Sequence, residues 1–412
     1  MVYQQRKYKF PFDFDQHHYR RTIAGVEVVI HCHHYNARLQ SIVESTRQIN
    51  GKEIILSAAE EVFSHYIQTI LTANSAFQNL TSLEQGQLAA DLYAHLGYGS
   101  LDFSQVDFSR IDRLDDCDRP VITASHSHFV EGWQAGFPAI QRPICTFTEG
   151  YLQGVIHGLT GQVVDVREEC CRMEGAPECR FLVLGDRNQS FSRTPKAPLT
   201  FLPHSPETIL TSPNIDSQKI INTLVDMPFE GNHEGLMPAF NVYLANIPAD
   251  FYNLVCIRFI EAMQKQNLLS TAKKLLFYAG EICALNTLRG ILHSPEWEQL
   301  VEPMVKVESD RLHGLVAVTN GLAWSEWYIQ HYDPPERLEM KSLRSYEALG
   351  YLGYRGYSPH PQCYMLAGLA TGMMEMLHGE GTVEERLGIY HTDETACICT
   401  HHETCQFMVE VL

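Results

Sequence analysis

The stretch "VVDVREECCRMEGAPECRFLV", residues 163–183, places cysteines and carboxylates between two short runs of strand-forming residues. The glycine and proline of "EGAPEC" are typical of a turn, so the stretch predicts a strand, a turn and a returning strand. Glu168, Cys171 and Cys179 follow the pattern Glu-x2-Cys-x7-Cys, and such a hairpin can direct all of them toward one ion. A disulfide, a redox pair and a metal site would each account for these cysteines.

The same pattern occurs again near the carboxyl end of the chain. "VREECCRMEGAPECRF" aligns with "TDETACICTHHETCQF", and upstream residues 127–161 align without a gap with residues 345–379. The alignment pairs Cys145 with Cys363, Glu168 with Glu394, Cys171 with Cys397, and Cys179 with Cys405. An internal repeat of this size predicts two similar domains that pack about a pseudo-twofold axis.

Composition narrows the class of protein. The chain has 412 residues and a formal net charge of −18, because 31 Lys and Arg stand against 49 Asp and Glu. Such an acidic surface repels phosphate backbones and anionic membranes, so nucleic acid and membranes are not expected partners. No apolar run approaches the roughly 18 residues of a membrane helix, and the amino terminus has no secretory pattern. We expect a cytoplasmic protein whose cysteines are buried thiols or metal ligands. A homodimer remains open.

The domain boundaries follow from the repeat and from a segment rich in Pro, Ser, Thr and Asn. Residues 186–218 lack sustained periodicity and are predicted to be a linker. The first domain is expected at 1–185 and the second at 219–412. Amphipathic helices are predicted around 51–71 and 268–292, at corresponding places in the two copies.

The repeated cysteines favour a structural zinc site in each copy. Three thiolates and one carboxylate form a tetrahedral set suited to zinc, which predicts two zinc ions per chain. Ordinary buried thiols are one alternative, but they would have to fall in the same register twice. A reversible redox pair is another, although no Cys-x-x-Cys motif is present.

The segment "GYLQGVIHGLTGQVVDVREECCRMEGAPEC" resembles the 4-vinyl reductase domain, which occurs in phenol-responsive bacterial activators and a bacteriochlorophyll biosynthesis protein. The resemblance covers roughly 60 residues of each half. It implies that zinc is held by Cys145, Glu168, Cys171 and Cys179 and by Cys363, Glu394, Cys397 and Cys405. It also implies an α+β fold in which each domain is an antiparallel sheet flanked by helices, with a zinc-stapled hairpin and a ligand cavity. The activators' ATPase and DNA-binding parts have no counterpart here.

The two copies differ in their histidines. The first copy contains "VVIHCHHYN" and "VITASHSHF", whereas the segments that we align with them in the second copy lack these histidines. Strand alternation would place His31 and His33 on one face, and His126 and His128 would lie at a strand-to-helix junction. These four imidazoles could hold iron, copper or a haem, or act as general acid or base. The alternative is a chance cluster among 20 histidines.

Aromatic residues suggest where a ligand would bind. The second copy contains "GLAWSEWYIQHYDPP" and "SYEALGYLGYRGYSPH", and Trp133, Tyr346 and Tyr351 are candidate ligand contacts. Two functions therefore remain. The first is a zinc-stabilised tandem domain protein that binds a small apolar, aromatic or tetrapyrrole-like ligand. The second is a redox or hydrolytic metalloenzyme that uses the first domain's histidines. No nucleophile elbow, phosphate-binding loop or nucleotide fingerprint defines a reaction.

Overall fold

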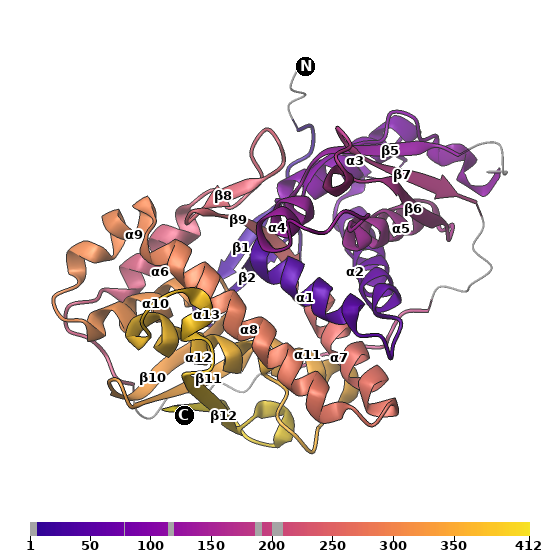
Figure 1. Ribbon diagram of the computed structural model, residues 1–412. Coiled ribbons are helices and arrows are strands. Elements are labelled where there is room, and N and C mark those ends of the chain that lie inside the picture. Colours follow the sequence, from indigo (N-terminus) through magenta and orange to yellow (C-terminus); the bar gives the residue numbers. More distant parts are fainter. Residues whose placement is uncertain (1–5, 78, 114–118, 186–191, 200–208) are drawn as a thin grey trace.

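The computed structural model describes residues 6–77, 79–113, 119–185, 192–199 and 209–412 (Figure 1). The fold is α+β, with antiparallel sheets throughout. The amino-terminal half contains β1 (Phe12–Asp15), β2 (Arg20–Ile23), β3 (Val26–Cys32), α1 (His33–Ser45), α2 (Gly51–Ala73), η1 (Ser75–Phe77), α3 (Ser82–His95), β4 (Gly99–Asp102), η2 (Phe108–Arg113), β5 (Val121–Ser127), α4 (His128–Gly136), α5 (Thr146–Thr160), β6 (Asp165–Cys170), η3 (Arg172–Glu174) and β7 (Cys179–Leu184).

The carboxyl-terminal half repeats this order from β3 onward, with α9, η4 and α13 as additional elements. It contains α6 (Ser217–Asp226), β8 (Met237–Ala239), β9 (Val242–Pro248), α7 (Ala249–Lys265), α8 (Leu269–Leu292), α9 (Pro295–Leu300), η4 (Glu302–Met304), α10 (Ser309–Gly321), β10 (Ser325–Asp333), β11 (Arg337–Ser345), α11 (Tyr346–Arg355), α12 (Tyr364–His378), α13 (Val383–Arg386), β12 (Tyr390–Ala396), η5 (Ile398–Thr400) and β13 (Cys405–Val411). The helices expected around 51–71 and 268–292 are confirmed as α2 and α8.

Each half has its own four-stranded antiparallel sheet with the same strand order. The first sheet runs β4-β5-β7-β6, and the second runs β10-β11-β13-β12. In the sequence, helices α4 and α5 lie between β5 and β6 of the first sheet, and α11 and α12 lie between β11 and β12 of the second. The second of these helices packs on a long helix of its own half, α5 on α2 and α12 on α8. The structure therefore consists of two similar α+β units.

A third, central sheet joins the halves in the order β1-β2-β3-β9-β8. Its β3 and β9 pair antiparallel, and Ile30 lies opposite Asn246. These two residues occupy the same place in their strands, because β3 ends at Cys32 and β9 at Pro248. A residue that pairs with its own counterpart marks a pseudo-twofold axis through the ladder.

The helices beside the central sheet are exchanged between the halves. The first half's α1 packs on α8 of the second half, and the second half's α7 packs on α2 of the first. Figure 1 shows the indigo α1 lying along the orange α8. By length and composition α8 could cross a membrane, but 61% of its most apolar window is buried inside the structure. Its contacts with α12 and α1 identify it as a core helix.

The predicted linker lies only partly within the described residues. Of 186–218, residues 186–191 and 200–208 lie outside them, and Ser217 already belongs to α6. The described segment 192–199 touches both halves, because the Thr194 amide donates to Glu61 and Lys196 pairs with Asp250 at 2.6 Å.

Glycine allows a close contact between the backbones of two helices in the second half. A Cβ at Gly368 of α12 would lie 2.2 Å from the Phe277 carbonyl oxygen of α8. We expect Gly368→Ala to reduce the free energy of unfolding by about 1–3 kcal/mol, because the helices would have to separate. Chemical denaturation measures this change.

Gly136→Ala is the matched control. Nothing lies within 4 Å of a Cβ at Gly136, which ends α4. There alanine should be neutral or stabilise by up to about 1 kcal/mol, since it restricts the unfolded chain. Equal stability changes in the two variants would show that the α8–α12 contact does not depend on glycine.

Candidate functional site

Each cysteine cluster forms where a helix begins beside a hairpin. Cys145 immediately precedes α5, Cys171 precedes the η3 turn, and Cys179 opens β7. Strand β6 brings Glu168 to the same place. The second half repeats the arrangement with Cys363, Glu394, Cys397 and Cys405. The predicted strand–turn–strand hairpin is confirmed.

The spacing of the sulfur atoms suits a tetrahedral ion. In the first cluster, Cys145 Sγ lies 4.0 Å from Cys171 Sγ and 3.7 Å from Cys179 Sγ, which are 3.8 Å apart. The corresponding distances in the second cluster are 3.9, 3.5 and 3.7 Å. Sulfur atoms about 2.3 Å from a tetrahedral ion stand about 3.8 Å apart. Each cluster, with its glutamate, could hold a metal ion, because its four ligand atoms all lie within 4.8 Å of one another.

The glutamates provide a second test of this fit. Glu168 Oε2 accepts a hydrogen bond from the Cys145 amide at 2.8 Å, and Glu394 Oε2 accepts from the Cys363 amide at 2.9 Å. In both residues the buried Oε1 atom has no hydrogen-bond partner. Burial, together with nearby Cys171, raises the pKa of Glu168 to about 8. A cation at the centre would use the free oxygen and offset the cost of a buried carboxylate.

The four predicted histidines do not assemble into one site. Among the described residues, the groups of three or more potential ligand atoms within 4.8 Å of one another are the two cysteine clusters. The prediction that His31 and His33 share a strand face is wrong, because β3 ends at Cys32 and His33 begins α1. His33 Nδ1 lies 3.2 Å from the Tyr243 carbonyl oxygen, and His128 Nε2 lies 2.9 Å from Asn36 Nδ2. These two imidazoles are held by structural hydrogen bonds.

The strand-to-helix boundary also corrects the alignment of the histidines. The counterpart of His31 is Ile247 and that of His33 is Ala249, whereas the sequence comparison paired "VVIHCHHYN" with "PAFNVYLAN", residues 238–246, and so placed both counterparts six residues earlier. The difference between the halves persists, since neither counterpart is a histidine.

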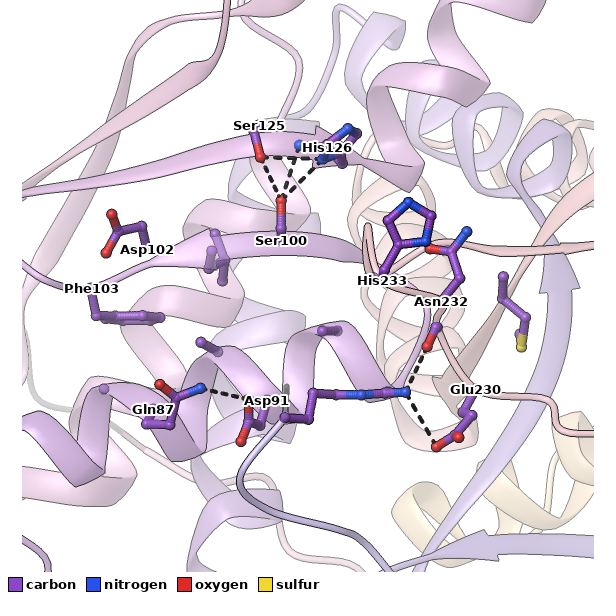
Figure 2. A pocket seen from close by; sticks show the side chains of 18 of the residues that line it. Gln87, Asp91, Ser100, Asp102, Phe103, Ser125, His126, Glu230, Asn232 and His233 are labelled. Carbon is purple, nitrogen blue, oxygen red and sulfur yellow. Dashed lines mark hydrogen bonds and ion pairs between the residues drawn. The ribbon is translucent and has the colours of Figure 1, made fainter. Parts of the chain in front are cut away.

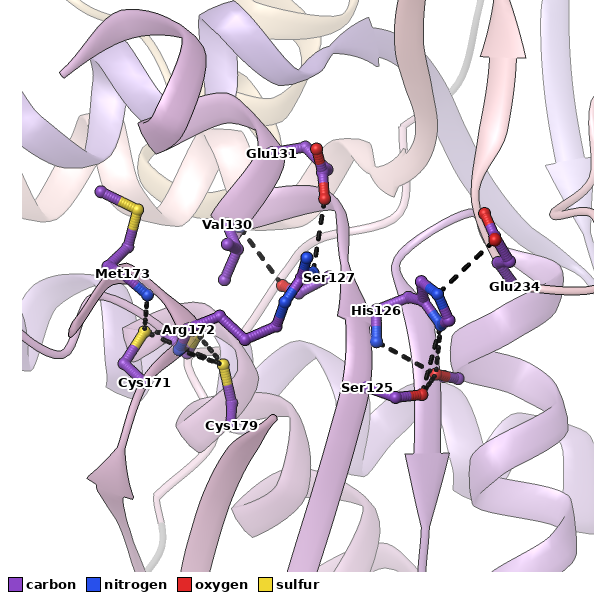
Figure 3. Close-up of polar contacts among 12 residues, drawn as sticks. Ser125, His126, Ser127, Val130, Glu131, Cys171, Arg172, Met173, Cys179 and Glu234 are labelled. Carbon is purple, nitrogen blue, oxygen red and sulfur yellow. Dashed lines mark hydrogen bonds and ion pairs between the residues drawn. The ribbon is translucent and has the colours of Figure 1, made fainter. Parts of the chain in front are cut away.

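His126 lines a large open cavity between the halves. The cavity measures about 1520 Å³ and is lined by α3, β4 and β5 on one side and by residues 227–239 on the other (Figure 2). His126 Nδ1 is 3.2 Å from Ser125 Oγ and 3.4 Å from Ser100 Oγ. Its Nε2 atom lies 3.6 Å from Glu234, and Figure 3 shows it directed away from Cys171 and Cys179.

His31 instead lies in an aromatic interior between the halves. It is fully buried, and its ring centroid is 4.6 Å from Tyr35, 4.9 Å from Tyr252 and 5.4 Å from Trp324. Tyr346 follows at 6.4 Å. Both ring nitrogens of His31 and the Tyr346 hydroxyl are buried without hydrogen-bond partners. Burial lowers the pKa of His31 to about 3, so the ring is neutral at physiological pH.

The sequence missed most of this interior. Tyr35 follows His31 by four residues, but Tyr252 belongs to α7 of the other half, and only the packing between the halves brings it beside His31. Of the three residues proposed as ligand contacts, only Tyr346 lies here. Trp133 is buried in the first half beside Phe137, with its ring centroid 4.9 Å away, and its indole Nε1 has no partner. Tyr351 is half-buried, farther along α11.

Comparison with known proteins identifies a family model and solved structures that resemble this chain. The family model of the 4-vinyl reductase domain matches residues 133–184, which span the end of α4 and the complete first cluster. The match confirms the resemblance to that domain over these residues. The phenol-bound sensory domain of the transcription activator PoxR is 14% identical and covers 42% of this chain and 84% of that chain, with a TM-score of 0.36. That likeness is too distant to carry an argument. No curated protein matches.

The cluster geometry predicts independent metal sites. Cys171→Ser should remove one bound ion and Cys397→Ser the other, and each should destabilise the protein by several kcal/mol, about the scale of a structural metal's contribution to folding. Metal content is measured by mass spectrometry of the purified chain. Cys256→Ser is the control, because Cys256 belongs to neither cluster. Full metal content in either ligand variant would contradict the assignment.

The buried histidine predicts a pH dependence of stability. His31 has a depressed pKa in the folded state, so between about pH 4 and 6 the unfolded chain binds more protons there. Its contribution to stability is therefore complete at neutral pH and decreases as the pH falls below the unfolded value. His31→Phe should lower the slope of unfolding free energy against pH by about 1.4 kcal/mol per pH unit in this range.

Urea denaturation at several pH values measures the slope. Tyr151→Phe is the control, since it changes a buried ring of the first half without removing an imidazole. If His31→Phe and the parent have equal slopes, His31 is not buried as a neutral ring.

Proposed function

Because residues 133–184 match the 4-vinyl reductase domain and both cysteine clusters fit a metal ion, we propose that the protein holds two zinc ions and binds one small molecule. The ligand class is a small aromatic molecule with a hydroxyl group. Its site is the interior around His31 and Tyr346, between the two halves. The zinc ions fix the hairpins and take no direct part in binding.

The observation that carries this proposal is the set of polar groups without partners around His31. Leaving a buried donor or acceptor unpaired costs about 1–3 kcal/mol. The neutral imidazole and the Tyr346 hydroxyl offer donors and acceptors in an otherwise aromatic space. A phenol-like molecule satisfies both requirements: its hydroxyl pairs with these groups while its ring packs on Trp324 and Tyr252.

The size of the space favours a single ring over a tetrapyrrole. Tyr35, Tyr252 and Trp324 already lie within 5.4 Å of the His31 ring centroid. A ligand therefore enters only as these rings move apart, and a macrocycle would require the central sheet and helices to separate.

The corresponding interior of the first half supports one ligand per chain. There Ile247 takes the place of His31, and His128 takes the place of Tyr346 and is paired with Asn36. The cavity beside Asn36 has a volume of about 10 Å³, which is room for about one water molecule.

Zinc is the metal that the ligand chemistry favours. Three soft thiolates and one carboxylate in a buried tetrahedral arrangement suit Zn²⁺ better than a hard cation such as Mg²⁺ or Ca²⁺. The ligand sets are Cys145, Glu168, Cys171 and Cys179, and Cys363, Glu394, Cys397 and Cys405.

We further propose that the two halves arose by internal duplication, with a first unit at 1–185, a linker at 186–218 and a second unit at 219–412. The matching strand orders of the two sheets and the ladder between β3 and β9 support this division. The described cysteines are free thiols, which is the state expected in the cytoplasm, where we propose that the protein is located.

The test compares phenol with toluene, which has a similar ring and no hydroxyl. The parent should bind phenol more tightly, and Tyr346→Phe and His31→Phe should each weaken phenol binding about fivefold to tenfold, since each loses about one hydrogen bond. Toluene binding should remain unchanged in both variants. Calorimetric titration measures both ligands, and Tyr151→Phe controls for the loss of a buried hydroxyl elsewhere. Equal binding of phenol and toluene by the parent would contradict the proposed site.

Although Tyr346→Phe should weaken phenol binding, it should increase the stability of the ligand-free protein. Tyr346→Phe removes a buried hydroxyl that has no partner, so the ligand-free chain should gain about 1 kcal/mol in unfolding free energy. In contrast, Tyr151→Phe should destabilise, because the Tyr151 hydroxyl donates to the Ala89 carbonyl at 2.6 Å. Destabilisation by both variants would mean that the Tyr346 hydroxyl is satisfied within the protein.

A further inference from the structure

The two metal clusters differ at one sulfur atom. The turn that follows Cys171 reads Arg172-Met173, whereas the turn that follows Cys397 reads Ile398-Cys399. Both turns are short 3-10 segments that end in a left-handed residue, Gly175 in the first half and His401 in the second. Cys399 therefore occupies the place of Met173. Its position gave no sign of function in the sequence, where it matched no repeated pattern.

The additional thiol lies against a metal ligand. Cys399 Sγ is 3.2 Å from Cys397 Sγ, closer than any two sulfur atoms within either ligand set. In the first half, Cys171 Sγ accepts a hydrogen bond from the Met173 amide at 3.5 Å. Cys397 has no such bond from the turn, and the Cys399 thiol stands in that place.

We propose that Cys397 and Cys399 form an oxidisable dithiol that releases the metal ion of the second cluster when hydrogen peroxide converts it to a disulfide. The inference rests on the proposed metal ion for the release, whereas the disulfide itself needs only the two cysteines. The first cluster does not respond in this way, because Met173 cannot form a disulfide.

The reaction balances with peroxide as the oxidant. The Cys397 thiolate attacks one peroxide oxygen, the O–O bond breaks, and Cys397 becomes a sulfenic acid as hydroxide leaves. The Cys399 sulfur then attacks the Cys397 sulfur, the S–O bond breaks, and the S–S bond forms. The thiol proton and one proton from solvent combine with the two leaving hydroxides. The sulfurs lose two electrons in total, and one peroxide becomes two water molecules.

The position of Cys399 makes it suited to this second step. A disulfide has a bond length of about 2.05 Å, so the two sulfur atoms need approach by only about 1.2 Å. Cys399 is not among the four ligands, and its sulfur stays available while the ion is bound. A disulfide between two ligands, in contrast, would require the ion to leave first. Once Cys397 is oxidised, Cys363, Cys405 and Glu394 remain, and three ligands hold the ion more weakly.

Peroxide can reach the pair through the exposed turn beside it. Both sulfur atoms are buried, but His401, His402 and Glu403 directly after the η5 turn are exposed. The ring of Tyr357 stacks on His401 with centroids 3.7 Å apart and covers the turn from one side. A small movement of these residues admits a molecule of peroxide's size.

The experiment treats the full chain, loaded with two zinc ions, with hydrogen peroxide. A chromophoric chelator measures released zinc, and peptide mass spectrometry maps disulfides. The parent should release one of its two ions and contain a Cys397–Cys399 disulfide, and dithiothreitol should restore binding. Cys399→Ser should keep both ions at the same peroxide dose. Met173→Cys should give the first cluster the same response, so that both ions are released.

Several outcomes would overturn the inference: zinc release from Cys399→Ser at the parent's rate, a disulfide between Cys363 and Cys405 in the parent, or no Cys397–Cys399 disulfide. Disulfide mapping of the peroxide-treated parent needs no variant. It therefore tests the Cys397–Cys399 disulfide even if Cys399→Ser folds poorly. Failure of the proposed function is distinguishable. It would show as fewer than two zinc ions before oxidation, or as an absence of phenol binding, and the disulfide can be mapped in either case.

Discussion

The antiparallel ladder between β3 and β9 is the interaction on which the rest of the structure depends. At its centre, Ile30 and Asn246 direct their backbone groups away from each other and toward loops of the opposite halves. The Ile30 amide donates to the Leu322 carbonyl at 3.2 Å, and the Asn246 amide donates to the Leu96 carbonyl at 2.9 Å. The two loops therefore close across the axis, and each supplies the partner of a buried backbone group. Neither half can satisfy these groups alone, so the halves form one cooperative unit.

The exchanged helices follow from this ladder. Once β3 and β9 pair, α1 and α7 leave the sheet toward the long helices of the opposite halves, α8 and α2. Each long helix then packs against the glycine-containing helix that begins after the upstream cysteine: α2 packs against α5, and α8 against α12. At Gly150, a Cβ would lie only 2.4 Å from the Leu56 carbonyl oxygen. This close packing fixes the start of α5 beside the β6–β7 hairpin. The cysteine clusters are therefore positioned by the core, and an ion bound in each would add a local cross-link to it.

Local patterns predicted the local structure well. The turn in "EGAPEC" and the register of the cysteine repeat depend on neighbouring residues, and both could be recognised from the sequence. The prediction that His31 and His33 share a strand face was wrong for an equally local reason. Strand alternation was extended past Cys32, although the helix α1 begins at His33. The His31 interior could not be predicted, because Tyr346 lies more than three hundred residues away and joins His31 only through the pairing of β3 with β9. A repeat in the sequence indicates two units but does not specify how they interlock.

The two interiors share a similar backbone and differ in the side chains that line them. Backbone positions near the axis must fit the contacts of both halves, whereas the side chains that face each interior can differ. In the first half, Asn36 joins the Tyr252 hydroxyl, at 2.6 Å, to His128 Nε2, at 2.9 Å, while His128 Nδ1 is buried without a partner. The second half has no equivalent bridge, because the counterpart of Asn36 is Tyr252 itself, and the Tyr346 hydroxyl stays unpaired. One ring nitrogen is therefore unpaired in the first interior, whereas both His31 nitrogens and the Tyr346 hydroxyl are unpaired in the second, and under the proposed function a ligand supplies their partner.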